Sequence, residues 1–156
     1  MKTLLKLRLI NWHRFRNDTI DFSESVLLSG ENGAGKSTIL DAIQYAITCS
    51  KANFNKAAHQ EKGERNLNSY IRCKTGNEEH PYERTGELSA HIALEFFDDA
   101  KNAPFILGVV MDSSTEEKEP NTAWYVMENR HLSDDFFFAG KKVKGISAFR
   151  QTNARD

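Results

Sequence analysis

Glycine, lysine and serine recur in residues 30–37 at a spacing that can wrap around phosphate. The segment reads GENGAGKS, so that Gly30, Gly33 and Gly35 precede Lys36 and Ser37. Glycines allow the backbone to turn tightly, and its N–H groups can then converge on phosphate oxygens. A helix that begins at the same place adds unpaired N–H groups and the positive end of its dipole. The pattern G-x-x-x-x-G-K-[ST] therefore predicts a P-loop for a nucleoside triphosphate.

Three side chains at the end of this segment have distinct roles in the predicted site. Lys36 can reach the β- and γ-phosphates as a positive charge, and the Ser37 hydroxyl is a hard oxygen ligand that suits Mg²⁺. Thr38 adds a hydroxyl suited to the α-phosphate. We expect ATP and Mg²⁺ as cofactors and Ser37 as the metal ligand. The expected nucleotide contacts are Gly30, Glu31, Asn32, Gly33, Ala34, Gly35, Lys36, Ser37 and Thr38.

The segments that flank the loop fit this interpretation better than a chance glycine-rich turn. Val26, Leu27 and Leu28 form a short apolar run directly before it, which is typical of a buried strand. Apolar residues recur after it at helical spacing and predict a helix over residues 36–48.

Hydrolysis needs more than a P-loop, because an acidic residue must hold Mg²⁺ and another group must orient the attacking water. Asp112 is the catalytic candidate, since it follows the apolar run ILGVVM as in a Walker B motif. Ser113, however, stands where an ABC-type catalytic glutamate would be, and residues 132–135 read LSDD, without the glycines of a signature motif. We favour the alternative that Asp112 opens an acidic hairpin loop, and the catalytic residue of this chain stays unassigned.

Other charged residues could touch phosphate or metal, and each also has a structural interpretation. Arg14 and Arg16, in the turn after the first strand, could reach nucleotide or DNA, or could lie in a solvated turn. Asp41, one helical turn after the P-loop serine, could support the metal, although a polar helix position is the simpler expectation. Arg65 and Arg72 could bind phosphate, but a surface position is the default for arginine.

Alternating apolar residues predict a sheet. The clearest strand covers residues 88–96, with Leu88, Ala90, Ile92, Leu94 and Phe96 on one face. Further strands are expected at residues 5–10, 19–22, 105–111 and 123–127, shorter ones at 136–138 and 143–146, and a short helix at 67–71. The expected fold class is α/β, a P-loop NTPase with an antiparallel β meander.

The composition is that of a folded domain of ordinary size. The chain has 156 residues, 39% of them hydrophobic and 28% charged, with a net charge of −1. Residues 1–16 nevertheless carry five basic side chains and no acidic one, and this local positive charge could attract phosphate. The chain has no signal-peptide core, its two cysteines are too few for a disulfide framework, and its five histidines lack zinc-ligand spacing. A cytoplasmic protein without membrane contact is expected.

Two stretches, LLKLRLINWHRFRNDTIDF and SVLLSGENGAGKSTILDAIQYAI, together resemble the SMC group of ABC ATPases, which includes MukB. Further along, FNKAAHQEKGERNLNSYIRCKTG and HIALEFFD are similar to JetC, the SMC-like ATPase of the Wadjet anti-plasmid systems. The resemblance implies that residues 30–38 are the Walker A motif. It also implies that the signature and Walker B motifs lie beyond a long coiled coil, in a C-terminal half. No sequence pattern identifies the glutamine of the family's Q-loop. Gln151 is the only glutamine in the second half of the sequence.

The resulting expectation is that residues 1–156 form the N-terminal lobe of an SMC/ABC-type ATPase head. Its partners would be ATP, its own C-terminal half, a second head in an ATP-dependent dimer, double-stranded DNA and kleisin-like accessory subunits. The chain alone would then bind ATP without efficient hydrolysis. Two alternatives stay open, namely a complete small P-loop enzyme such as a nucleotide kinase or GTPase, and a nucleotide-responsive binding module without catalysis.

Overall fold

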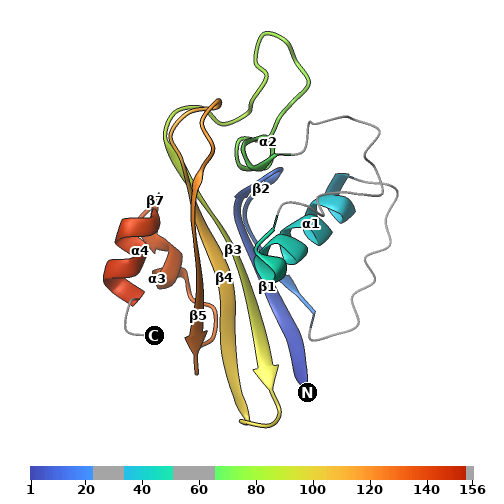
Figure 1. Ribbon diagram of the computed structural model, residues 1–156, viewed down its shortest axis with the longest axis vertical. Helices are drawn as coiled ribbons and strands as arrows, with labels where there is room; N and C mark the ends of the chain where they lie inside the picture. The colour runs from blue at the N-terminus through green and yellow to red at the C-terminus, as the bar shows by residue number, and fades with distance from the viewer. Residues whose placement is uncertain (23–33, 51–65, 154–156) are drawn as a thin grey trace.

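A five-stranded antiparallel sheet, in the order β2-β1-β3-β4-β5, forms the centre of the protein (Figure 1). The computed structural model describes residues 1–22, 34–50 and 66–153. The strands of the sheet are β1 (Lys2–Trp12), β2 (Phe15–Asp21), β3 (Leu88–Asp98), β4 (Ala103–Ser113) and β5 (Asn121–Glu128). Helices α1 (Ala34–Thr48) and α2 (Leu67–Ile71) pack on one face. The other face is covered by α3 (Asp134–Phe137), the hairpin of β6 (Phe138–Ala139) and β7 (Lys142–Val143), and α4 (Ile146–Asn153).

Strands β1 and β2 form a hairpin closed by the Trp12–Phe15 pair. Both predicted strands are confirmed, although β2 begins at Phe15 rather than at residue 19. The alternating pattern of residues 5–10 predicts a strand with one buried face, but residues 7–10 are all buried. The sequence could not show this, since burial of the second face depends on the α3–α4 segment, which comes from the other end of the chain.

Strands β3, β4 and β5 form the meander that the alternating pattern predicted. The β3 residues predicted to share a face all pack in the core beneath α1 and α2. That core also contains Ile39, Ala42, Tyr45 and Ala46 of α1. The predicted helices at residues 36–48 and 67–71 are confirmed as α1 and α2, and the predicted strand at residues 26–28 lies outside the described residues.

The segment that covers the second face differs from expectation. Residues 136–138 were expected to be a strand, but α3 ends at Phe137 and only Phe138 enters β6. Residues 143–146 were also expected to be a strand, but β7 ends at Val143 and α4 begins at Ile146. Runs this short carry no clear period, and here packing of Phe137 and Phe149 on the sheet decides the conformation. Among the described helices, none has the length and apolar character needed to cross a membrane.

Candidate functional site

The start of α1 is the described part of the predicted P-loop. The helix begins at Ala34, within the glycine-rich motif, and so places its first-turn N–H groups where the sequence predicted a phosphate site. Lys36 is exposed, Ser37 is half-buried and Thr38 is fully buried. This gradient leaves the lysine and serine at the surface while the threonine faces the protein. Residues 30–33, which include Glu31 and Asn32, lie outside the described residues.

Two side chains from other elements bond to the first turns of α1. The indole N–H of Trp12 donates to the carbonyl oxygen of Thr38 at 3.1 Å. The hydroxyl of Tyr70, in α2, donates to the carboxylate of Asp41. Asp41 is a polar position of α1, as the simpler expectation had it, and it is only 2% exposed. Its carboxylate faces α2 because Tyr70 provides the hydrogen bond that burial of a charged group requires.

Arg14, in the β1–β2 turn, and Arg16, at the start of β2 rather than in the turn, are both exposed to solvent. Arg16 bonds through Nη2 to Oε1 of Glu83 at 3.2 Å, and both side chains are largely exposed. The Cys73 thiol and Arg16 both donate hydrogen bonds to Glu83 and lower the pKa of its carboxyl. A nucleotide or DNA contact by Arg14 or Arg16 stays a prediction.

Arg72 is fully buried, whereas a surface position was expected. Its Nε donates to Oγ of Ser113 at 3.1 Å, and burial lowers the pKa of its guanidinium. Ser113 in turn donates to Asn68 at 2.6 Å, and Asn68 donates to backbone carbonyls of the acidic β4–β5 loop. Arg72 therefore joins α2 to the end of β4. Arg65, the other phosphate candidate, lies outside the described residues.

Asp112 lies on the face of the sheet opposite to α1. Its neighbour Met111 packs in the core beneath α1, and successive side chains of a strand point to opposite faces. The carboxylate accepts hydrogen bonds from Ser89 Oγ at 2.8 Å and from the backbone N–H of Ile146 at 3.2 Å. These bonds tie β4 to the first residue of α4. Asp112 lies inside β4 and pairs with Asn121, so the acidic hairpin loop opens after Ser113 rather than at Asp112. These bonds give Asp112 a structural role, and a Walker B role for this residue stays a prediction.

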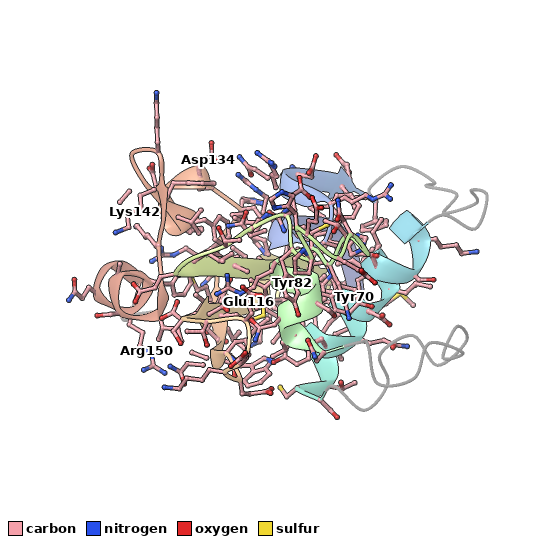
Figure 2. All side chains as sticks on the ribbon, turned by 90° about the horizontal axis from the view of Figure 1, so that it is seen from above. Tyr70, Tyr82, Glu116, Asp134, Lys142 and Arg150 are labelled. Carbon is pink, nitrogen blue, oxygen red and sulfur yellow. The ribbon has the colours of Figure 1, made fainter. Side chains whose placement is uncertain are left out.

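Hydrogen bonds join the second face of the sheet to residues 132–146, and Asp112 makes one of them. The hydrogen bonds run from Arg8 to Asp134, from the Leu132 amide to Glu95, from His91 to the Lys144 carbonyl and from the Ile146 amide to Asp112. Burial lowers the pKa of His91 from 6.5 to about 4, which keeps the imidazole neutral near pH 7. Figure 2 shows Asp134, Lys142 and Arg150 on this side of the sheet, away from Tyr70 and α1.

No metal centre is formed by the residues that the structure describes. Among them, histidines, cysteines and acidic residues do not gather in groups of three or more. Cys49 is exposed and Cys73 is buried, and both are free thiols. The Ser37 hydroxyl at the start of α1 fits Mg²⁺ as one hard oxygen ligand, so the remaining ligands would have to come from elsewhere, including nucleotide oxygens and water.

Comparison with known proteins agrees with the P-loop assignment. Residues 4–61 match the family model described as the P-loop containing region of AAA domain, which covers less than half of the chain. The N-terminal stretch is also similar to the C-subunit of the nuclease SbcCD from Staphylococcus saprophyticus, with 37% identity over 72 residues. The corresponding Staphylococcus aureus protein is 38% identical over 72 residues. Each match covers 43% of this chain but only 6% of the relative. These similarities support the resemblance of the N-terminal stretch to SMC-like ATPases.

Proposed function

We propose that this chain supplies the ATP-binding part of an SMC-like, DNA-associated ATPase. The observation that carries the proposal is the start of α1 at Ala34, inside the sequence GENGAGKS, with Lys36 exposed and Ser37 half-buried in the first turn. In this arrangement the helix N-terminus attracts the phosphates, Lys36 neutralises the β- and γ-phosphate oxygens, and Ser37 provides one oxygen ligand for Mg²⁺. When bound, Mg²⁺ would neutralise negative charge on the phosphate oxygens while the γ-phosphoryl group is transferred to water.

Hydrolysis in this proposal depends on residues outside the chain. A Walker B carboxylate and a signature motif would come from a C-terminal half and from a second head, each head completing the other's P-loop. Support comes from the sequence, which lacks a glycine-containing signature motif, and from Asp112, which bonds to α4 on the far face of the sheet. The finer assignment, a relative of JetC that acts with double-stranded DNA and kleisin-like subunits in plasmid defence or DNA maintenance, rests on the sequence resemblance.

Substitution of Lys36 by alanine tests the nucleotide site. Lys36→Ala removes a charge-assisted phosphate contact, and we expect ATP binding in the full-length protein to weaken by roughly 1.5–3 kcal/mol in titration calorimetry. Lys142→Ala is the matched control, since this exposed lysine lies on the α4 side of the sheet (Figure 2). Equal ATP affinities for the wild type and Lys36→Ala would show that the P-loop assignment is wrong.

The dependence on a second half has its own test. The isolated chain should hydrolyse ATP very slowly, and co-expression with the C-terminal half should raise both its thermal stability and its ATP affinity, because ligand binding and folding are linked. Fast, Lys36-dependent turnover by the chain alone would favour the complete small enzyme instead.

A further inference from the structure

We propose that Trp12 and Tyr70 are positioning residues that hold the first turns of α1 in the register required for phosphate binding. This inference rests on the proposed function, because it concerns the same nucleotide site. Neither residue belongs to the P-loop motif, and neither was singled out by the sequence. Trp12 ends β1 and Tyr70 lies in α2.

The first contact fixes the helix directly after the P-loop serine. The indole N–H of Trp12 donates to the Thr38 carbonyl, and Thr38 follows Ser37 in the chain. The Trp12 ring is fully buried and stacks on the Tyr70 ring, with 4.5 Å between ring centroids and 9° between planes. The indole is therefore held from one side by the Tyr70 ring and bonds to α1 through its edge.

The backbone of β1 departs from regular alternation to place this indole. Leu7 and Leu9 face α1, so strict alternation would turn Trp12 to the opposite face. Asn11, however, has a left-handed φ of 54°, and its side chain donates to the Ser89 carbonyl at 2.9 Å. This local irregularity brings Trp12 into the core beneath α1, where it meets Thr38.

The second contact lies one helical turn further along α1. The Tyr70 hydroxyl donates a hydrogen bond to the Asp41 carboxylate, and both residues are almost completely buried. Thr38 and Asp41 are three positions apart, so the two contacts lie on neighbouring parts of one helix face. The backbone of Tyr70 is itself tied to the β1–β2 hairpin, because its carbonyl accepts a hydrogen bond from the His13 amide.

These two hydrogen bonds provide a directional constraint on α1 that its apolar packing does not provide. Ile39, Ala42 and Ala46 hold the helix against the sheet, but hydrophobic contact is non-directional and tolerates a small slide or tilt. Phosphate recognition by N–H groups and a lysine is directional, and a misplacement of about 1 Å weakens it strongly. The two hydrogen bonds, one from the last residue of β1 and one from α2, select one register among those that packing alone permits.

The test separates affinity from stability in the full-length protein. Trp12→Phe keeps an aromatic ring but removes the N–H donor, and Tyr70→Phe keeps the ring but removes the hydroxyl. We expect each variant to weaken Mg-ATP binding by about three- to tenfold in titration calorimetry, the effect of one lost hydrogen bond. Tyr125→Phe is the matched control, since it removes a buried hydroxyl on the opposite face and should leave the dissociation constant unchanged.

A rescue experiment distinguishes positioning from general support of the fold. Asp41→Asn keeps an oxygen that accepts the Tyr70 hydroxyl and should retain most of the affinity, whereas Asp41→Ala should lose as much as Tyr70→Phe. The inference is overturned if Trp12→Phe and Tyr70→Phe lower the melting temperature but bind Mg-ATP as tightly as the wild type. If Lys36→Ala also binds normally, the proposed function fails as well. If only Lys36→Ala is impaired, the nucleotide site stands and positioning by Trp12 and Tyr70 is refuted.

Discussion

Asp112 offers the clearest choice between a catalytic and a structural role for an acidic residue at the end of a strand. Asp112→Ala removes the acceptor for Ser89 Oγ at 2.8 Å and for the Ile146 amide at 3.2 Å. Loss of a side-chain acceptor at a helix N-terminus costs roughly 0.5–2 kcal/mol, and loss of the hydroxyl bond roughly 0.5–1.5 kcal/mol. Because Asp112 is half-buried and water can replace part of both bonds, we expect a local loss of about 1–3 kcal/mol.

Hydrogen–deuterium exchange measures this loss where it occurs. A local opening free energy lowered by about 1–3 kcal/mol accelerates amide exchange in α4 by roughly 5- to 150-fold. Mg-ATP affinity should stay within about twofold of the wild type, because the carboxylate faces away from α1. Glu117→Ala, an exposed acidic residue of the β4–β5 loop, is the control and should change neither quantity.

The opposite pattern would refute this reasoning. If Asp112→Ala abolished Mg²⁺-dependent hydrolysis in the full-length protein while exchange in α4 stayed at the wild-type rate, Asp112 would be a metal ligand. The Walker B interpretation of the ILGVVMD sequence would then be correct.

Two further predictions concern the same face of the sheet. Gly108→Ala should destabilise the protein by roughly 1–3 kcal/mol in chemical denaturation. The added Cβ would lie 2.5 Å from the Tyr125 hydroxyl oxygen and 2.7 Å from the Ile92 carbonyl oxygen. An unchanged denaturation midpoint would contradict this packing. Burial lowers the pKa of His91 to about 4, whereas in the unfolded chain this imidazole takes up a proton near pH 6.5. Neutral His91 therefore contributes its full share to the free energy of unfolding above pH 6.5, and this share declines as the pH falls toward 4. Its full size is about 3 kcal/mol, and His91→Gln, which can still donate to the Lys144 carbonyl, should flatten the pH dependence of stability between pH 6.5 and 4. Identical pH profiles for the variant and the wild type would show that another group is responsible.

The sequence alone determined the elements whose signal is local and periodic. The alternation of residues 88–96 predicted both the strand and the face that packs beneath α1, because a strand repeats every two residues whatever lies around it. The helix after the P-loop was predicted to within two residues at its start, since the motif and the helical spacing agree. The same motif predicted the nucleotide site, and its chemistry depends on residues that are adjacent in the chain.

Tertiary structure decided the environment of the polar side chains, which no local pattern encodes. Arg72 was expected at the surface, and no local pattern predicted that Asp41 is buried. Both are buried because Ser113 and Tyr70 approach them from distant parts of the chain with matching donors and acceptors. The short runs at residues 136–138 and 143–146 fold as α3, β6, β7 and the start of α4 because the second face of the sheet must be covered. Burial of a charge or of a short apolar run is stable only when partners arrive from elsewhere in the fold, so it depends on contacts that are formed in space rather than along the sequence.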